Sequence, residues 1–188
     1  TTKGNKLMIQ TYTGKLFNPL ATENEDCGQI ELMDIAHALS HLCRFNGHTK
    51  RFYSVGEHSL HVSCVLAQTS PENQAWGLLH DAAEAYLGDM VRPIKKRMPD
   101  FQVIEDRLLQ RIAKRFGLVW PIPDVVFDAD DIMLATEFRD LMQSPPQSPL
   151  RMQPIPPLPG WNAYLPPLAQ TPFDTRQVFL YEAHRLGL

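Results

Sequence analysis

Hydrophobic positions recur at helical spacing over most of the chain, after a short start with a different pattern. Residues 7–20 alternate weakly between apolar and polar positions around Thr13-Gly14, which predicts a short hairpin. From Gln29 the period changes, and Leu32, Ile35, Ala36, Leu39, Leu42 and Cys43 mark one face of a first core helix. The pattern therefore predicts a mainly helical protein with a hairpin at its N-terminal end.

Start and stop residues divide the remaining pattern into further helices. Ser54 and Glu57 form a capping-box sequence, which predicts a helix from there to about Ala67. Ser70-Pro71 begins a third helix that we expect to run to about Leu87. A fourth helix follows Pro99-Asp100 and stops at Gly117, and a fifth follows Pro121-Ile122-Pro123 and runs to about Met142.

The composition changes sharply after the fifth helix. Ten of the 16 prolines lie between Ser144 and Phe173, which excludes a long helix there. Trp161, Tyr164 and Leu165 favour a segment that wraps the core, and Asp174 or Thr175 begins a final helix. We expect one all-α domain over 1–188, a bundle of about six helices, with an N-terminal extension (1–27), a helical core (28–143), a proline-rich wrap (144–173) and a C-terminal helix (174–188).

The composition and net charge of the chain exclude some classes of function. The 188 residues include 44% hydrophobic and 21% charged residues, typical of a globular protein, and carry a net charge of -3. This charge argues against binding a nucleic acid polymer, which requires a basic face. Three cysteines without paired spacing favour reduced thiols in the cytoplasm, and we expect them in or near the core. The sequence shows no signal peptide and no membrane span, so we expect no membrane partner.

Four residues form a candidate metal-binding set. His58 lies in the second predicted helix, His80-Asp81 in the third, and Asp130 in the fifth. Two imidazoles and two carboxylates suit one divalent cation such as Mn²⁺, Co²⁺, Fe²⁺, Ni²⁺, Zn²⁺ or Mg²⁺ better than a thiolate-preferring ion. Asp131 is the alternative to Asp130, and we favour Asp130 because the flanking Ala129 and the following LATE segment match it.

The third predicted helix adds a further acid. His80 and Glu84 are four residues apart and share a helix face, whereas Asp81 is turned by about 100° from His80. Gly77, one turn before Asp81, leaves space beside that carboxylate. Glu84 can therefore take a proton from a nucleophile or return one to a leaving oxygen.

Other polar residues have simpler interpretations. His37 and His41 resemble a metal pair, but without a carboxylate motif beyond Asp34 they predict a polar helix face. His61 is interpreted as structural, and Glu57 as a capping residue. His48 lies in a loop near Arg44 and leaves phosphate contact and a solvent role equally open. Lys95-Lys96-Arg97 is by default a solvated basic run.

The order H…HD…D resembles the signature of the HD-domain metal-dependent phosphohydrolases. The segments EHSLHV, HDAAEAYLGD and ADDIMLATE are similar to the 5′-deoxynucleotidase-like branch, in particular to small prophage-type members. Arg44-Phe45, fourteen residues before His58, resembles an arginine–aromatic pair of those enzymes, although relatives often carry Trp at the second position. The similarity covers roughly residues 8–143 and implies the HD-domain fold and the metal set His58, His80, Asp81 and Asp130.

The resemblance and the residues together predict the chemistry. We expect a metal-dependent phosphohydrolase that removes phosphate from a nucleotide by attack of metal-activated water, with 5′-deoxynucleotidase as the favoured activity. Glu84 is the expected acid/base, and Arg44 the expected phosphate clamp. The resemblance also places Asp89 at the substrate pocket, with Phe45 beside the sugar and Lys95 adding positive charge.

Several alternatives remain open from the sequence. The same scaffold serves deoxynucleoside triphosphate triphosphohydrolases, and phosphodiesterases or alarmone hydrolases. A non-catalytic nucleotide-binding protein is the third possibility, although an intact ligand set beside Glu84 and Arg44 speaks against it. Relatives assemble as dimers or larger closed oligomers, so we expect a homo-oligomer.

Overall fold

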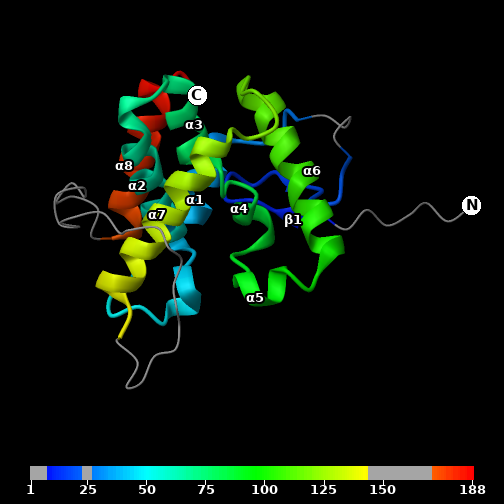
Figure 1. Ribbon diagram of the computed structural model, residues 1–188. Coiled ribbons are helices and arrows are strands. Elements are labelled where there is room, and N and C mark those ends of the chain that lie inside the picture. The colour runs from blue at the N-terminus through cyan, green and yellow to red at the C-terminus, as the bar shows by residue number, and fades with distance from the viewer. Residues whose placement is uncertain (1–7, 23–26, 144–170) are drawn as a thin grey trace, which may run out of the picture.

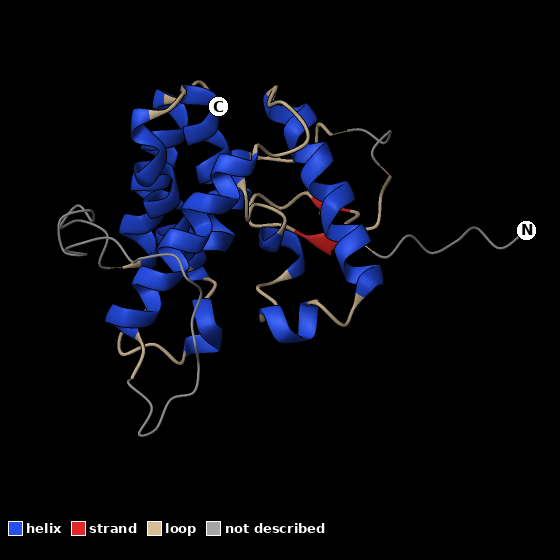
Figure 2. Cartoon of the chain, in the orientation of Figure 1, coloured by secondary structure: helices blue, strands red, loops and turns tan. Residues whose placement is uncertain are grey.

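The computed structural model describes residues 8–22, 27–143 and 171–188 and consists mainly of helices (Figures 1 and 2). The expected all-α bundle with a short N-terminal hairpin is confirmed. The longer helices are α1 (Leu32–His41), α2 (Val55–Val65), α3 (Pro71–Leu79), α6 (Pro99–Phe116), α7 (Asp124–Leu141) and α8 (Pro172–Arg185). Shorter turns are η1 (Arg44–Gly47), η2 (Leu66–Gln68), α4 (Glu84–Leu87) and α5 (Arg92–Lys95).

The hairpin packs its turn against the first helix. Strands β1 (Ile9–Gln10) and β2 (Leu16–Phe17) pair antiparallel, with Ile9 opposite Phe17. The buried carboxylate of Asp34 in α1 accepts hydrogen bonds from the backbone N–H and the hydroxyl of Thr13, at 2.7 and 2.9 Å. Because Phe17 is fully buried, the hairpin is part of the core rather than an appendage.

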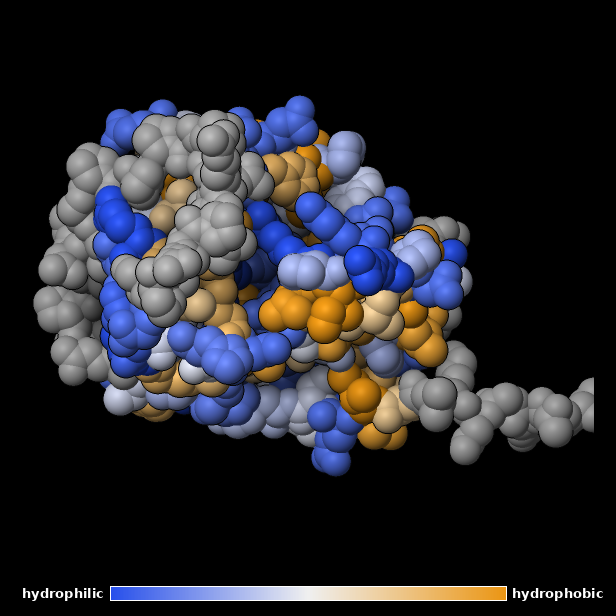
Figure 3. Space-filling view, turned by 60° about the horizontal axis from the view of Figure 1, so that its bottom comes forward, coloured by the Kyte–Doolittle hydropathy of each residue, from blue (hydrophilic) through white to orange (hydrophobic). Residues whose placement is uncertain are grey.

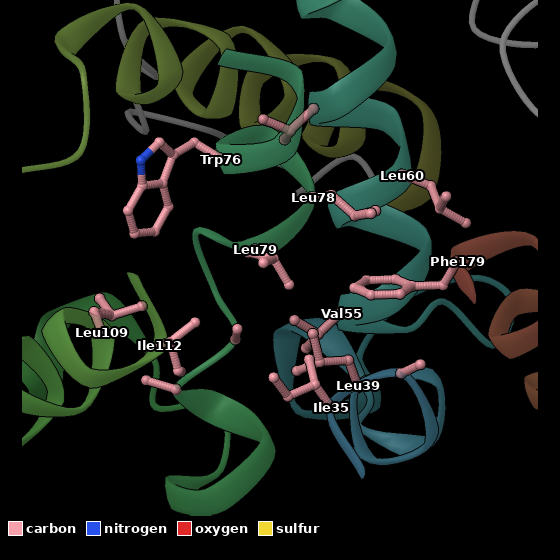
Figure 4. Packing of buried hydrophobic residues seen from close by; sticks show 14 of the residues in the cluster. Ile35, Leu39, Val55, Leu60, Trp76, Leu78, Leu79, Leu109, Ile112 and Phe179 are labelled. Carbon is pink, nitrogen blue, oxygen red and sulfur yellow. The ribbon is translucent and has the colours of Figure 1, made fainter. Parts of the chain in front are cut away.

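The core gathers side chains from helices that are distant in the sequence. Helix α2 packs on α1, α3, α7 and α8, and α3 also contacts α7 (Figure 1). Figure 4 shows side chains of α3 between those of α6 and those of α1 and α2. Fully buried members include Ile35, Leu39, Val55, Trp76, Leu78, Leu79, Ile112 and Phe179. This packing holds α2, the end of α3 and α7 beside one another.

Most of the expected helix ends are confirmed. The Ser54 hydroxyl accepts a hydrogen bond from the N–H of Glu57, and Gly117 ends α6 with a left-handed φ of 69°. The carboxylate of Glu57, however, does not complete a reciprocal box but accepts two hydrogen bonds from Arg51. A guanidinium offers that buried carboxylate two charged donors, more than one backbone N–H could.

The final helix begins slightly earlier than expected. Helix α8 starts at Pro172, where Thr171 and Asp174 form a reciprocal capping box. Phe179 and Ala183 are fully buried, as their spacing predicted. The proposed wrap over 144–173, with Trp161, Tyr164 and Leu165, falls largely outside the described residues.

The expected helix over Pro71–Leu87 is wrong in one respect, because the helix breaks in its middle. Helix α3 ends at Leu79, and α4 begins only at Glu84. Across the break the backbone makes tighter bonds, from the N–H of Ala82 to the carbonyl of Leu79 and from that of Glu84 to Asp81. Such i to i−3 bonds are those of a 3₁₀ turn, so side chains three apart, rather than four apart, come into line.

Gly77 has a different role from the one expected. A Cβ at this position would lie 2.8 Å from the side chain of Leu66 and 2.9 Å from the Cα of Ser63. Gly77 therefore allows α3 to approach the end of α2 closely. It does not clear space beside Asp81.

The cysteine prediction is also wrong for two of the three residues. Cys43 and Cys64 are exposed, and Cys27 is half-buried. Cys64 lies in the last turn of α2, after the buried residues 55–63, and Cys43 lies two residues beyond the end of α1. Among residues 8–22, 27–143 and 171–188, no helix combines the length and the apolar composition that a membrane crossing needs.

Candidate metal centre

His58, His80 and Asp130 converge although they belong to three segments. His58 lies in α2, His80 directly follows α3, and Asp130 lies in α7. One donor atom from each lies within 4.8 Å of the others, and this group could hold a metal ion. The Nε2 atoms of the two histidines are 3.3 Å apart, and Oδ1 of Asp130 is 3.1 Å from Nε2 of His58.

Asp81 lies at the edge of the same group. Its Oδ2 is 3.3 Å from Nε2 of His80 and 3.7 Å from Nε2 of His58. All four residues of the sequence-based ligand set are therefore brought together. The two histidines are fully or almost fully buried, whereas the carboxylates retain a partly open side.

The hydrogen bonds of the imidazoles show that the group fits a cation. Nδ1 of His80 lies 2.8 Å from the carbonyl oxygen of Gly77, and Nδ1 of His58 lies 2.5 Å from Oε1 of Glu137. Both acceptors lack a hydrogen, so each Nδ1 must donate. The neutral rings then direct two Nε2 lone pairs at each other, an arrangement that a shared cation relieves.

The ionisation of the centre is strongly shifted. Burial and the charge of Arg44 lower the pKa of His58, but the carboxylates of Glu137 and Asp130 outweigh them and raise it to about 9. Burial raises the pKa of Asp81, yet His80, His58 and Arg44 outweigh burial and lower it below its usual range. In the absence of a cation, protonation of His58 compensates part of the charge of the neighbouring carboxylates.

Asp130 and Asp131 are distinguished by their directions. Oδ1 of Asp130 faces His58, whereas Oδ2 accepts a hydrogen bond from Nη2 of Arg92 at 2.5 Å. Asp131 is not a member of the His58, His80 and Asp130 group and accepts from Nη1 of the same arginine at 3.0 Å. The preference for Asp130 over Asp131 thus agrees with the geometry.

Glu84 lies buried beside the candidate centre. Its Oε2 has no hydrogen-bond partner among the described residues, and the residue is only 6% exposed. Burial raises the pKa of Glu84 well above its usual value, and the charges of Asp81 and Asp89 add to this. Among the neighbouring charges, that of Asp81 acts most strongly on Glu84, and the backbone N–H of Glu84 donates to the carbonyl oxygen of Asp81 in the tight turn.

The guanidinium group of Arg44 extends to the candidate centre, and one of its edges is hydrogen-bonded to Glu137. Its Nε and Nη2 donate to Oε2 of Glu137 at 3.2 and 3.0 Å, and its Nη1 lies 3.5 Å from Oδ2 of Asp81. The guanidinium therefore keeps its Nη1 edge toward Asp81 and the candidate metal centre. Phe45, next in the chain, has a left-handed φ of 53° and packs edge-on against Phe138 of α7.

The two other expected substrate residues lie nearby. Burial raises the pKa of Asp89, which lies close enough to act on Glu84. Lys95 donates to Glu105 at 2.7 Å. Burial lowers the pKa of the Lys95 ammonium group, but the hydrogen bond and charge of Glu105 outweigh burial and raise it, and the charges of Glu84 and Asp81 add to this. Figure 3 shows hydrophilic residues in a recess on the face toward the viewer, with a hydrophobic patch beside it.

Three residues of the site had no role in the sequence interpretation. Glu137 is fully buried and binds His58, Arg44 and the hydroxyl of Tyr53, the last at 2.8 Å. Arg92 bridges Asp130 and Asp131. A signal for Glu137 existed, because it lies seven residues after Asp130 and so on the same helix face. Tyr53 and Arg92 had no comparable periodic signal.

The remaining histidines lie apart from the candidate centre. His37 stacks on Tyr12 at 3.6 Å between ring centroids, and His41 is exposed at the end of α1, so a polar helix face is confirmed. His61, one turn after His58 in α2, is buried, and burial lowers its pKa to about 3. His48 is exposed in the turn after Arg44.

The fold and site define a mainly helical protein with a buried His/Asp group that could hold a metal. The chain is 40% identical over 134 residues to the uncharacterized protein YfdR of Escherichia coli strain K12, which covers 71% of each protein. This chain therefore belongs to the same family as YfdR. It is also 43% identical over 101 residues to an uncharacterized protein of Rhodobacter capsulatus, half of this chain and 52% of that relative. No protein-family model matches the chain.

Proposed function

We propose that this protein is a divalent-metal-dependent phosphohydrolase that removes phosphate from a nucleotide, with a 5′-deoxynucleoside monophosphate as the favoured substrate. The observation that carries the proposal is the pair of buried imidazoles whose Nε2 atoms face each other at 3.3 Å with carboxylates beside them. His58, His80, Asp81 and Asp130 would hold one divalent transition metal or Mg²⁺. When bound, such a cation lowers the pKa of a water molecule toward neutrality and polarises a phosphoryl oxygen.

Glu84 supplies the proton transfer in this proposal. Its carboxyl group is buried, has an oxygen without a partner among the described residues, and has a raised pKa. A carboxyl group with a pKa closer to neutrality can take a proton from a nucleophile and return it to a leaving oxygen. The same acid placed in water would stay ionised and would be a poor donor.

The cations around the centre support an anionic substrate. Arg44 turns its Nη1 edge toward the metal ligands, and Arg92 lies across the outer side of Asp130. Both guanidinium groups can donate to phosphate oxygens. Lys95 adds positive charge, and Phe45 offers an aromatic face for a sugar or base, while Asp89 can accept a hydrogen bond from a sugar hydroxyl.

A phosphate-release assay tests the proposal. The purified protein, stripped of metal and reloaded with Mn²⁺, Co²⁺ or Mg²⁺, is incubated with nucleoside and deoxynucleoside mono-, di- and triphosphates. We expect metal-dependent release of inorganic phosphate that is highest with deoxynucleoside monophosphates. His80→Ala and Asp81→Ala should abolish it, and activity that survives in either variant would overturn the metal site.

The same assay separates the rival functions. Release of triphosphate instead of phosphate would indicate a triphosphohydrolase, and turnover of phosphodiesters or alarmones alone would indicate the other hydrolases. Calorimetric titration addresses the non-catalytic alternative, in which nucleotides bind tightly to the metal-loaded protein without phosphate release. Each of these results would overturn the proposed nucleotidase activity in favour of the corresponding rival function.

A further inference from the structure

We propose that Glu137 is a positioning residue that holds the ring of His58 so that its Nε2 atom faces the cation. Glu137 lies in α7 and His58 in α2, 79 positions apart in the chain. The inference rests on the proposed metal site, but it adds a residue that neither touches the cation nor forms part of the expected ligand set.

Among the described residues, Glu137 accepts four hydrogen bonds and donates none. Oε1 accepts from Nδ1 of His58 and from the hydroxyl of Tyr53, and Oε2 accepts from Nε and Nη2 of Arg44. Both oxygens are thus occupied as acceptors in a fully buried position. A carboxylate is the one common side chain that offers two acceptors and no donor in this shape.

This arrangement selects one tautomer of His58. With Nδ1 donating to Glu137, a neutral ring has its lone pair on Nε2, which is the atom that faces His80 and Asp130. Carboxylate partners of this kind orient ligand imidazoles and make them more basic, and their loss weakens metal binding by about 10- to 100-fold.

Arg44 and Tyr53 in turn fix Glu137. Arg44 binds the carboxylate side-on through two N–H groups, so the acid cannot rotate away from His58 without breaking a buried ion pair. The expected phosphate residue Arg44 and the ligand His58 therefore share one buried acid. Displacement of either group should move the other.

The test is metal binding, which does not depend on turnover. Co²⁺ is titrated into the metal-free full chain, and its dissociation constant and visible absorption are measured for wild type and Glu137→Gln. The amide side chain of Gln has nearly the shape of the Glu137 carboxylate. Its NH₂ group, however, would face either the donors of His58 and Tyr53 or those of Arg44. We expect Glu137→Gln to bind Co²⁺ about 10- to 100-fold more weakly, with an altered absorption spectrum.

Glu57→Gln is the matched control. Glu57 is a buried carboxylate in α2 that binds an arginine, Arg51, but makes no hydrogen bond to a metal ligand. This variant should keep wild-type Co²⁺ affinity. Equal affinities of Glu137→Gln and wild type would overturn the inference alone, whereas failure of the wild type to bind Co²⁺, Mn²⁺ or Zn²⁺ would overturn it together with the proposed function.

A second measurement covers the case in which Glu137→Gln does not fold. Nitrogen-15 NMR of the Zn²⁺-loaded wild-type protein identifies which ring nitrogen of His58 carries the proton. We expect the proton on Nδ1 and the metal on Nε2. A proton on Nε2 would overturn the inference without any substitution.

Discussion

The guanidinium group of Arg92 lies across the carboxylate of Asp130, with Nη2 2.5 Å from Oδ2, while Oδ1 of the same carboxylate faces His58. The side chain of Arg92 remains 45% exposed, so it borders the candidate centre on the solvent side. The carboxylate of Asp130 thus lies between the buried imidazole of His58 and the guanidinium group of Arg92, which a substrate can reach.

We expect Arg92→Gln to weaken substrate binding more than metal binding. The substitution removes a charged donor to phosphate, which contributes about 1.5 kcal/mol, and KM should rise roughly tenfold. Metal affinity should stay equal or increase, because a positive charge beside Asp130 is lost. Steady-state kinetics and Co²⁺ titration measure the two effects, with Arg97→Gln, an exposed arginine five residues further on, as control. An unchanged KM would place the phosphate elsewhere.

Glu84→Gln should separate catalysis from metal binding. Gln is nearly isosteric but cannot transfer a proton at neutral pH, so we expect kcat to fall about 10²- to 10⁴-fold. The Co²⁺ dissociation constant should stay within about twofold of wild type, since Glu84 is not among the proposed ligands. The free energy of unfolding should not fall, because the change removes a buried carboxyl group that lies near Asp81 and Asp89. A kcat within tenfold of wild type would contradict this role.

Gly77→Ala should destabilise the protein through helix packing. The added Cβ would meet the backbone of Ser63 at 2.9 Å, and this contact cannot be relieved by a side-chain rotation alone. Overpacking of this kind costs about 1–3 kcal/mol, measured by urea unfolding of the metal-free protein. The carbonyl oxygen of Gly77 also accepts from His80, so Co²⁺ affinity should fall as well. Wild-type stability in this variant would show that α2 and α3 can move apart freely.

His61 should make the stability of the protein depend on pH. Its pKa is lowered to about 3 by burial in the folded protein, against about 6.5 in the unfolded chain. Between these values the unfolded chain binds more protons, so stability falls as the pH falls below about 6.5. From pH 7.5 to 5.5 the contribution of His61 should decrease by about 1.4 kcal/mol.

Urea unfolding of the metal-free protein at both pH values measures this effect. The pH-dependent difference between wild type and His61→Gln isolates His61 from the other titrating groups. The same pH dependence in both proteins would show that His61 does not stay neutral in the folded state.

Much of the fold could be predicted because the responsible signals are local. Periodic apolar residues located the longer helices, and Ser54, Pro99 and Gly117 marked helix ends by satisfying or ending the backbone hydrogen-bond pattern. The break at His80–Ala83 could not be predicted in this way. Its residues continue the apolar face without a proline or a glycine, so tertiary packing decides where the helix tightens.

For the candidate site, too, the residues with a local sequence signal could be predicted and those defined by long-range contacts could not. His58, His80, Asp81 and Asp130 could be found from residue type and from a known motif, and the structure brings them together. The spacing from Asp130 places Glu137 on the same helix face, but the roles of Glu137 and Arg92 depend on contacts across 79 and 38 positions of the chain, which the sequence alone does not show. Burial of Glu137 is unusual for an acid, and only the three-dimensional arrangement shows its donors.

The candidate ligands lie in α2, at the end of α3 and in α7. Metal binding at this centre would therefore be coupled to folding. An unfolded chain does not present these donors together, so a cation at this centre would bind the folded state and would join helices in the manner of a cross-link. At a free metal concentration a hundred times the dissociation constant, this linkage adds about 2.7 kcal/mol to the stability. A chelator would then lower the melting temperature, and the fraction of folded protein would follow the free metal concentration of its surroundings.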